Sequence, residues 1–481
     1  MNYRMITYLL GIILLIEAAL LAFPAGVAMI YGENALPFFA TMAALIAVSV
    51  PAVMLKPKNK RIFAKDGFVV VVAAWILMSV FGAIPFVLDG AIPSYVDALF
   101  ETVSGFTTTG ASILAEIESL PRGILFWRSF THWVGGMGVL LFMMAILPSA
   151  DGGQNMHLMR AETPGPTKGK LVPKMRQSAL ILYGIYIALT VVEIIALLLT
   201  GMPFYDSVVN SFATAGTGGF SVLNSSIGGY NNPAAEWVIA VFMFIFGVNF
   251  NLYYFIIIGK AREIFKSEEL RAYIGICAAS TVAIIINTLN ASQKLGDCIR
   301  DAFFQVISVM STSGFATLDY DAAWPQFSRT LIVLLTLVGA CAGSTAGGLK
   351  ISRVLIVLKG MLCRIRKILR PHSVNVVRID GETIPEETVN STMAYMSVYW
   401  FIIVVGSLVI SLDGFDFTTN ITAVLTCVNN VGPGLGAVGP AGNFSCFSDF
   451  NTLLLSFIML LGRLEIMPVL IFFSPMAWNK R

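Results

Sequence analysis

The sequence predicts an all-α polytopic membrane protein. In this fold, four repeats of membrane helix, pore helix, filter segment and membrane helix surround one pore, after two extra N-terminal spanning helices. Three observations lead to this prediction. The chain of 481 residues is 57% hydrophobic and only 12% charged, which is too apolar for a soluble protein. Its Lys and Arg residues gather in a few loops. Four short glycine-containing segments recur along the chain.

The four segments align on one glycine each, and each follows the same kind of lead-in. The glycines are Gly110, Gly219, Gly314 and Gly432. Thirteen residues earlier stand types that often cap helix N-termini, namely Asp97, Asp206, Asp301 and Thr419. Six residues earlier stand small residues, namely Ser104, Ala213, Ser308 and Thr426. A cap, a short apolar run and a glycine turn, repeated four times in phase, predict four pore helices that end at one filter.

The placement of basic residues predicts the topology. Lys and Arg cluster at 56–65, 160–176, 260–271 and 353–378, whereas the intervening loops are acidic and poor in basic residues such as Arg122 and Arg329. The positive-inside rule places the four basic loops and both termini on the cytoplasmic side of the membrane. The expected location is the inner membrane of the cell. Binding of nucleic acid is disfavoured, because every basic run flanks a hydrophobic span.

The expected elements follow from these turns and charges. Two N-terminal spans lie at 5–31 and 37–55, within a region 1–65. The repeats cover 66–176, 177–269, 270–390 and 391–481. Their membrane helices are expected at 66–90, 123–148, 178–201, 234–259, 271–290, 326–358, 391–411 and 450–474. The segments 93–106, 203–215, 298–311 and 415–428 are too short to cross and are predicted as re-entrant pore helices. Ten spans result, with inner linkers at 149–176 and 359–390 outside the bilayer.

A filter of this kind suits a cation that has lost its water. Backbone carbonyls surround the ion without trapping it, and glycine best adopts the backbone angles that point carbonyls at an axis. The C-terminal ends of four pore helices add negative partial charge. The candidate ligands are Thr108, Thr109, Gly110, Gly218, Gly219, Thr312, Ser313, Gly314, Asn430, Val431 and Gly432. The alternative, that these glycines only allow close helix packing, is disfavoured by four segments in phase.

A second feature interrupts the inner helix of the third repeat. Its Gly-rich and Ser/Thr-rich residues are Gly343, Ser344, Thr345, Ala346, Gly347 and Gly348. Broken backbone at membrane depth is tolerated where it lines a water-filled cavity, so the segment is predicted to be a gate. A packing kink is the alternative.

Arg463 and Glu465 lie inside the last span. At a rise of about 1.5 Å per residue, Arg463 is roughly 21 Å beyond Asp449, where an unpaired Arg costs about 2.5–3.5 kcal/mol. Arg463 therefore sets a barrier below the filter, contacts the third-repeat loop, or forms an ion pair with Glu465 or another acid. Glu193 is a weaker candidate of the same kind, and Glu17 is expected at a packing surface.

The remaining reactive residues give no catalytic motif. The six cysteines have no CxxC spacing; Cys298 and Cys446 share the predicted outer side, which would allow a disulfide, but unpaired thiols are favoured. The three histidines are scattered, and the spans lack a polar catalytic cluster. We therefore expect that the chain is not an enzyme. A secondary transporter of organic solutes is also disfavoured, because such proteins often carry inverted repeats, whereas these repeats share one orientation.

Several motifs together resemble the TrkH-type potassium uptake subunits, within the superfamily of TrkH, KtrB and HKT transporters. They are GFTTTGAS (105–112), GGFS (218–221), STSGFA (311–316), NNVGPGLG (429–436), GSTAGGLK (343–350) and LGRLE (461–465). The resemblance covers nearly the whole chain, and the two N-terminal spans resemble the TrkH branch. It implies K⁺ as the transported ion, a homodimer in membrane lipid with one pore per protomer, and a cytosolic nucleotide-binding partner of the TrkA type. It also implies that the loop 343–348 gates the pore and that Arg463 narrows it from below.

Glycine at all four filter positions is similar to the potassium-selective members of this superfamily. Serine at the first position would indicate sodium, so sodium or mixed-cation transport is the alternative function. No repeat carries the TVGYG sequence of tetrameric potassium channels, which predicts fewer carbonyl layers and modest discrimination between K⁺ and Na⁺.

Overall fold

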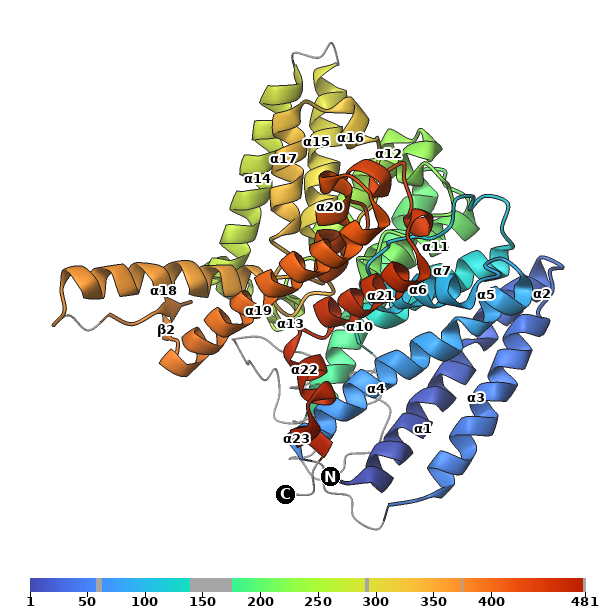
Figure 1. Cartoon of the computed structure of the whole chain (residues 1–481). Helices are drawn as coiled ribbons and strands as arrows, with labels where there is room; N and C mark the ends of the chain where they lie inside the picture. Colours follow the sequence, from blue (N-terminus) through green and yellow to red (C-terminus); the bar gives the residue numbers. More distant parts are fainter. Residues whose placement is uncertain (58–62, 139–174, 290–293, 373–374, 479–481) are drawn as a thin grey trace.

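The computed structural model describes residues 1–57, 63–138, 175–289, 294–372 and 375–478, and helices dominate it (Figure 1). The N-terminal layer consists of α1 (Tyr3–Leu20), α2 (Ala22–Ile30) and α3 (Leu36–Met54), and α1 packs against α3 and α4. The carboxylate of Glu33, which follows α2, accepts hydrogen bonds from the backbone amides of Arg122 and Gly123, each at 2.8 Å. The N-terminal helices are thereby attached to the start of α7.

Four similar units follow. The first helices of the units are α4 (Ala64–Gly82), α10 (Met175–Leu199), α14 (Glu268–Thr288) and α19 (Glu386–Ile410). The pore helices are α6 (Tyr95–Phe106), α11 (Phe204–Gly216), α15 (Leu295–Met310) and α20 (Phe417–Asn429). The returning helices are α7 (Arg122–Gly136), α12 (Pro233–Phe246), α17 (Gln326–Thr336) and α21 (Asp449–Arg463). The helical class and the positions of the four short pore helices agree with the prediction.

The units close on one another in order. Within each unit the pore helix packs against both the first and the returning helix. Each returning helix also packs against the pore helix of the next unit, as α7 does with α11, α12 with α15 and α17 with α20. The last returning helix, α21, packs against the first pore helix, α6. Elements far apart in the sequence thus form a closed arrangement, and its centre is lined by the ends of the pore helices.

The returning helices contain more breaks than the one that was predicted. Six described helices are long and apolar enough to cross a membrane, or seven if α12 and α13 (Phe250–Ile257) form one span, and these two meet at 92°. The span predicted at 326–358 is interrupted as predicted: α17 ends at Thr336, and residues 337–350 are not helical. The span predicted at 450–474 breaks between α21 and α22 (Met467–Phe473). The inner end of the span at 123–148 and the basic residues of 160–174 lie outside the described residues.

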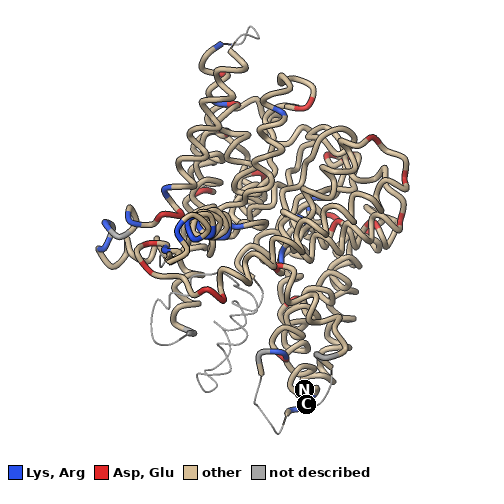
Figure 2. Tube along the Cα trace, turned by 60° about the vertical axis from the view of Figure 1, so that its left-hand side comes forward, with Lys and Arg blue, Asp and Glu red and all other residues tan. Residues whose placement is uncertain are grey.

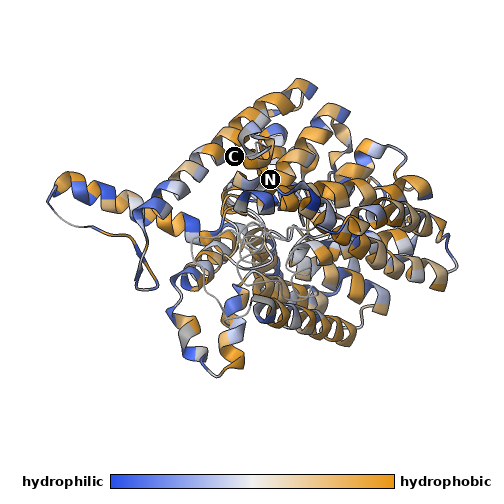
Figure 3. Cartoon of the chain, turned by 90° about the horizontal axis from the view of Figure 1, so that it is seen from below, coloured by the Kyte–Doolittle hydropathy of each residue, from blue (hydrophilic) through white to orange (hydrophobic). Residues whose placement is uncertain are grey.

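The linker at 359–390, predicted to lie outside the bilayer, contains the end of a helix and a β-hairpin. Helix α18 (Ile351–Leu369) extends into it and projects sideways from the body (Figures 1 and 3). Lys and Arg gather along this helix (Figure 2), and apolar side chains such as Leu358 and Ile368 are exposed on it. A hairpin of β1 (Arg378–Ile379) and β2 (Glu382–Thr383) follows, with positive φ at both Asp380 and Gly381 as tight hairpins require.

Shorter elements fill the loops. They are α5 (Ile84–Asp89), η1 (Ser226–Tyr230), η2 (Ala261–Lys266), α16 (Tyr320–Ala323), η4 (Ser411–Asp413), η5 (Gly436–Val438), η6 (Phe444–Cys446) and α23 (Pro475–Trp478). Cys298 is buried and Cys446 is exposed, and the six cysteines, which all lie in the described part of the chain, form no disulfide with one another.

The predicted capping residues lie within the pore helices rather than at their caps. The caps are Ser94, Pro203, Lys294 and Asp416. Asp97, Asp206 and Thr419 lie three residues beyond their caps, and Asp301 lies in the second turn of α15. The register between repeats was therefore right, but the chain begins each helix earlier, because Asp and Thr also suit the first helical turn.

Asp416 caps the fourth pore helix and supports a prediction about stability. Its carboxylate accepts hydrogen bonds from the Thr419 hydroxyl and from the amides of Thr418 and Thr419, which lower its pKa. Asp416→Ala should lower the free energy of unfolding at pH 7 by about 1 kcal/mol. Asp416→Asn should retain most of the stabilisation that the cap provides. Because the folded pKa is lowered, the carboxylate's contribution is complete above its unfolded pKa, near 3.9, and is lost as the pH falls through the folded value. Chemical denaturation in detergent tests this, and equal stabilities of Asp416→Ala and native protein at pH 7 would contradict it.

Candidate functional site

The four glycine segments have the same backbone shape. Their glycines all have positive φ, namely Gly110 (77°), Gly219 (76°), Gly314 (75°) and Gly432 (94°). Two residues before each glycine lies a second residue with positive φ, namely Thr108 (55°), Thr217 (57°), Thr312 (59°) and Asn430 (54°). Two left-handed residues separated by one other residue turn the chain sharply at the end of each pore helix. The second of these positions requires glycine, as the sequence predicted.

A repeated hydrogen bond holds each turn to its pore helix. The amide of the residue before the glycine donates to the small residue five positions back: Thr109 to Ser104 (2.9 Å), Gly218 to Ala213 (2.9 Å), Ser313 to Ser308 (2.8 Å) and Val431 to Thr426 (3.0 Å). This is the bond of a Schellman helix end, which satisfies a carbonyl that the helix leaves free. The small residues noted in the sequence are therefore the acceptors of this bond.

The glycines meet around a ring. A Cβ added to Gly110 would overlap the carbonyl oxygen of Gly218, and one added to Gly219 would overlap that of Ser313. A Cβ on Gly314 would overlap the carbonyl oxygen of Val431. The ring closes at Gly432, whose added Cβ would lie 2.8 Å from the carbonyl oxygen of Thr109. Each glycine thus faces the residue before the glycine of the next unit, so all four predicted segments come together.

The side chains beside these glycines serve different purposes. The hydroxyl of Thr109 lies 2.8 Å from that of Thr107, and the hydroxyls of Ser313 and Ser311 form the equivalent pair at 2.8 Å, so both pairs brace a turn. Asn430 donates to the Thr109 hydroxyl (2.9 Å) and to the Met459 carbonyl (3.0 Å). The fourth segment, which lacks Ser and Thr in its turn, is therefore linked to the first by an amide.

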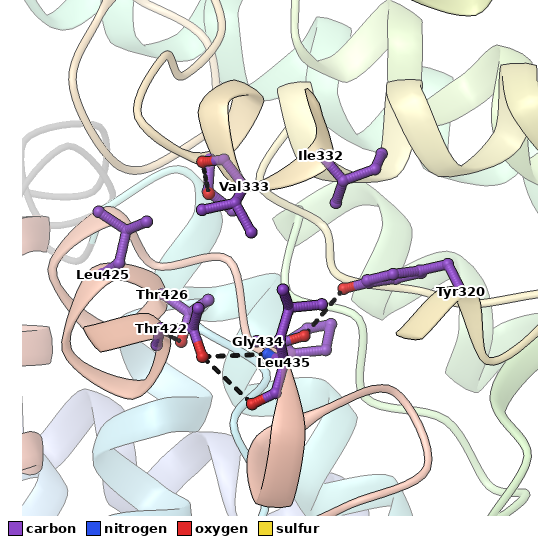
Figure 4. A pocket seen from close by; sticks show the side chains of 10 residues that line it. Tyr320, Ile332, Val333, Thr422, Leu425, Thr426, Gly434 and Leu435 are labelled. Carbon is purple, nitrogen blue, oxygen red and sulfur yellow. Dashed lines mark hydrogen bonds between the residues drawn. The ribbon is translucent and has the colours of Figure 1, made fainter. Parts of the chain in front are cut away.

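The outgoing part of the fourth segment is held by a different set of contacts. Thr422 on α20 accepts a hydrogen bond from the Leu435 amide (3.0 Å) and donates to the Leu435 carbonyl (3.2 Å), and the Tyr320 hydroxyl donates to Gly434 (3.4 Å) (Figure 4). These residues line a small pocket between α17 and α20. These hydrogen bonds hold the outgoing part of the fourth segment against α20 and Tyr320.

The predicted gate segment lies directly against the ring. The Gly347 amide donates to the Thr312 hydroxyl at 2.8 Å, and a Cβ added to Gly347 would lie 2.6 Å from that of Asn430. Gly343 accepts from the Phe250 amide at 2.9 Å, so the loop also fills the break between α12 and α13. Thr345 donates to the Phe246 carbonyl at 3.3 Å. The non-helical backbone thus finds its partners in a second helix break.

Arg463 connects this segment to two returning helices. It ends α21 and donates to the carbonyls of Thr345 (2.8 Å), Gly135 (2.5 Å) and Gly136 (3.0 Å). The last two carbonyls end α7, where a cation is favoured. The expected contact between Arg463 and the third-repeat loop is therefore observed. The alternative ion pair with Glu465 is wrong, because Glu465 pairs with Arg353 of α18.

Two residues at this site escaped the sequence analysis. Glu269 on α14 accepts from the amides of Ala342 (2.8 Å) and Ser352 (2.9 Å), at both ends of the loop. Lys350 donates to the carbonyls of Ala346 and Gly347 (3.1 Å). Both are buried charged residues at the edge of an apolar span, a feature that predicts a buried partner. Glu193 and Glu17 are also buried, and Glu17 lies beside Gly82 at a helix contact, as expected.

Comparison with known proteins decides the family. The family model TrkH, described as a cation transport protein, matches residues 36–275 and 276–480. The chain belongs to the TrkH family. The Trk system potassium uptake proteins TrkH of Salmonella typhimurium and Escherichia coli K12 are each 34% identical over the full length of both chains. The crystal structure of the potassium transporter TrkH from Vibrio parahaemolyticus matches all of both chains with a TM-score of 0.89 and 31% identity.

The family assignment confirms the resemblance seen in the motifs. It also agrees with a polytopic membrane protein, for which this TrkH-family chain supplies six helices of sufficient length in its described part. The curated relatives are named as transporters rather than enzymes.

Proposed function

We propose that this TrkH-family protein conducts potassium ions into the cell through the ring formed by its four glycine segments. The proposed ligands are backbone carbonyls of the residues 108–110, 218–219, 312–314 and 430–432. One observation carries the proposal: four glycines with positive φ each abut the carbonyl of the next segment, and this order closes into a ring. Carbonyls so arranged replace the water of a cation without binding it as tightly as a charge would. The names of the relatives support potassium as the ion.

The loop 343–348 and Arg463 form the gate in this proposal. The supporting contacts are the hydrogen bond from Gly347 to Thr312 of the filter and the bonds from Arg463 to three carbonyls. The units of the pore are proposed as residues 66–176, 177–269, 270–390 and 391–481, in an inner membrane with both termini in the cytoplasm. The protein is proposed to transport K⁺ without an enzymatic activity.

Partners also belong to this proposal. We propose a homodimer regulated by a cytosolic nucleotide-binding subunit of the TrkA type, which would contact the basic residues of α18. The relatives are named as parts of a Trk system, which supports more than one component. Light scattering on purified protein measures the copy number, and a monomer in detergent and in nanodiscs would contradict the dimer.

Uptake of rubidium into proteoliposomes, in competition with sodium, tests the ion and the filter together. Native protein should prefer K⁺ and Rb⁺ over Na⁺. Gly110→Ser should lower this preference, about tenfold if the strain costs some 1.4 kcal/mol of differential binding, because its side chain displaces the Gly218 carbonyl. Gly184→Ser on α10, where an added Cβ meets nothing within 4 Å, is the matched control.

Two outcomes would contradict the proposal. If Gly110→Ser keeps the native preference, Gly110 is a packing residue and the ring does not select the ion. If native protein carries Na⁺ as well as K⁺, the alternative of sodium or mixed-cation transport applies.

A further inference from the structure

A buried ion pair lies behind the ring, between the first and second units. Glu101 on α6 and Arg128 on α7 approach to 2.5 Å, and their side chains are 0% and 2% exposed. Burying two charges costs more free energy than an apolar pair of the same size, unless the remaining polar atoms are also bonded. The other contacts of these two side chains therefore indicate what the pair does.

The carboxylate of Glu101 holds the chain where it leaves the first filter segment. It accepts from the amide of Ile113 at 2.8 Å and from the hydroxyl of Ser112 at 3.1 Å. Ser112 follows Gly110 by two positions and Ile113 by three. The carboxylate thus fixes the direction in which the chain departs from the ring.

The guanidinium of Arg128 holds the second segment at the same level. It donates to the carbonyl of Ser221 at 3.0 Å, and its centre lies 3.6 Å from the centroid of the Phe220 ring. Phe220 in turn stacks on His132 at 4.1 Å, and His132 bonds Gly105 of α6 at 2.7 Å. Since Ser221 follows Gly219 by two positions, one ion pair joins the outgoing chains of two units.

The position of Glu101 has a counterpart in other units. It lies nine residues before its filter glycine, and the same count leads to Asn210, Gln305 and Ala423. Gln305 also contacts its outgoing chain, at Thr317 and Leu318, each at 3.5 Å, and Asn210 donates to Tyr230 at 3.1 Å. In the fourth unit the neighbouring Thr422 contacts the outgoing chain instead, by accepting a hydrogen bond from the Leu435 amide. Supporting the outgoing chain is thus common to the units, and the described residues show a charged pair in this place only in the first.

We propose that the Glu101–Arg128 pair is a positioning element of the filter, which sets the spacing of the first and second segments and hence the discrimination between K⁺ and Na⁺. The inference rests on the proposed function. The two side chains act on the ion through the backbone that they hold.

Four variants test this in the rubidium uptake assay, with the Michaelis constant and the Na⁺ competition measured separately. They are Arg128→Lys, Glu101→Gln, Arg128→Gln and the double variant of the last two. Arg128→Lys keeps the charge, but a single ammonium lacks the planar fork that reaches Glu101 and Ser221 together. Its K⁺/Na⁺ preference should fall about threefold, and that of each Gln variant about tenfold, in the range of coupling between contacting residues. Arg300→Gln is the control. Arg300 on α15 forms an ion pair with Glu236 on α12, with nitrogen and oxygen 2.6 Å apart, and its loss should leave the native K⁺/Na⁺ preference unchanged.

A purely structural pair would give a different pattern. Variants would then yield less folded protein by gel filtration, while the folded fraction kept the native preference and Michaelis constant. That result for Arg128→Lys and for the double variant would overturn the inference. If native protein itself does not prefer K⁺, the proposed function fails as well; if native protein is selective and the variants match it, only the positioning element fails.

Discussion

Arg463→Gln should raise the basal rate of potassium uptake. In the native protein, Arg463 donates to the Thr345 carbonyl of the proposed gate segment and to two carbonyls that end α7. A hydrogen bond to a charged donor contributes about 1.5–3 kcal/mol, so losing one such bond in the closed state should increase the open fraction about tenfold or more. Rubidium uptake by proteoliposomes without the regulatory partner measures this rate.

Arg463→Lys separates two explanations of such an increase. If the charge alone repels cations, Lys keeps the barrier and the native rate. If the bridge between three carbonyls holds the loop, Lys raises the rate, because one ammonium cannot reproduce the fork of a guanidinium. Arg271→Gln is the matched control. Arg271 is exposed, and its guanidinium donates to the carbonyls of Ser267 and Lys266, which precede α14. An unchanged or lower rate in folded Arg463→Gln would contradict a closed gate held by this residue.

Arg353→Met should cost about 3–5 kcal/mol of the free energy of unfolding, because it leaves the carboxylate of Glu465 buried without its partner. Arg353 lies in the first turn of α18, pairs with Glu465 in the break after α21, and lies 4.2 Å over the Tyr395 ring of α19. The double variant Arg353→Met/Glu465→Gln should recover much of the loss, since no charge remains buried. Chemical denaturation in detergent micelles measures both differences.

Arg364→Gln provides the comparison on the same helix. Arg364 is exposed and bonds Asn390 at 3.0 Å, so its loss should change the free energy of unfolding by less than about 0.5 kcal/mol. Equal effects of Arg353→Met and Arg364→Gln would mean that water reaches Glu465 and that the pair is not a buried connection between α18 and α21.

The turns of the four glycine segments could be predicted from the sequence because their requirement is local. Glycine adopts the left-handed conformation without strain, and the acceptors of the Schellman bond are small residues in all four segments. Both features recur at a fixed spacing, as at Gly110 and Ser104, so the fourfold repeat could be found by counting residues. The charge clusters predicted the alternation of spans for a similar reason, since each cluster lies next to the span it orients.

The breaks after α12 and α21 and the partners in the ion pairs could not be predicted in the same way. The amide of Phe250 in the second unit bonds the Gly343 carbonyl in the third, so the bend of one helix is stabilised by the loop of another. Glu465 pairs with Arg353, which lies 112 positions away, although Arg463 is nearer in sequence. Neither Glu101 nor Arg128 was identified as a candidate from the sequence, because nothing near either residue indicates its partner.

The sequence by itself determined the membrane class, the fourfold repeat, the ends of the short helices at the glycine turns and the glycines of the ring, because hydropathy and left-handed turns depend on neighbouring residues. The tertiary structure alone decided how the four segments close in order, which breaks face one another, and which buried charges pair. Those contacts join residues from different units, and the free energy of a buried polar group depends on the partner that the whole fold brings to it.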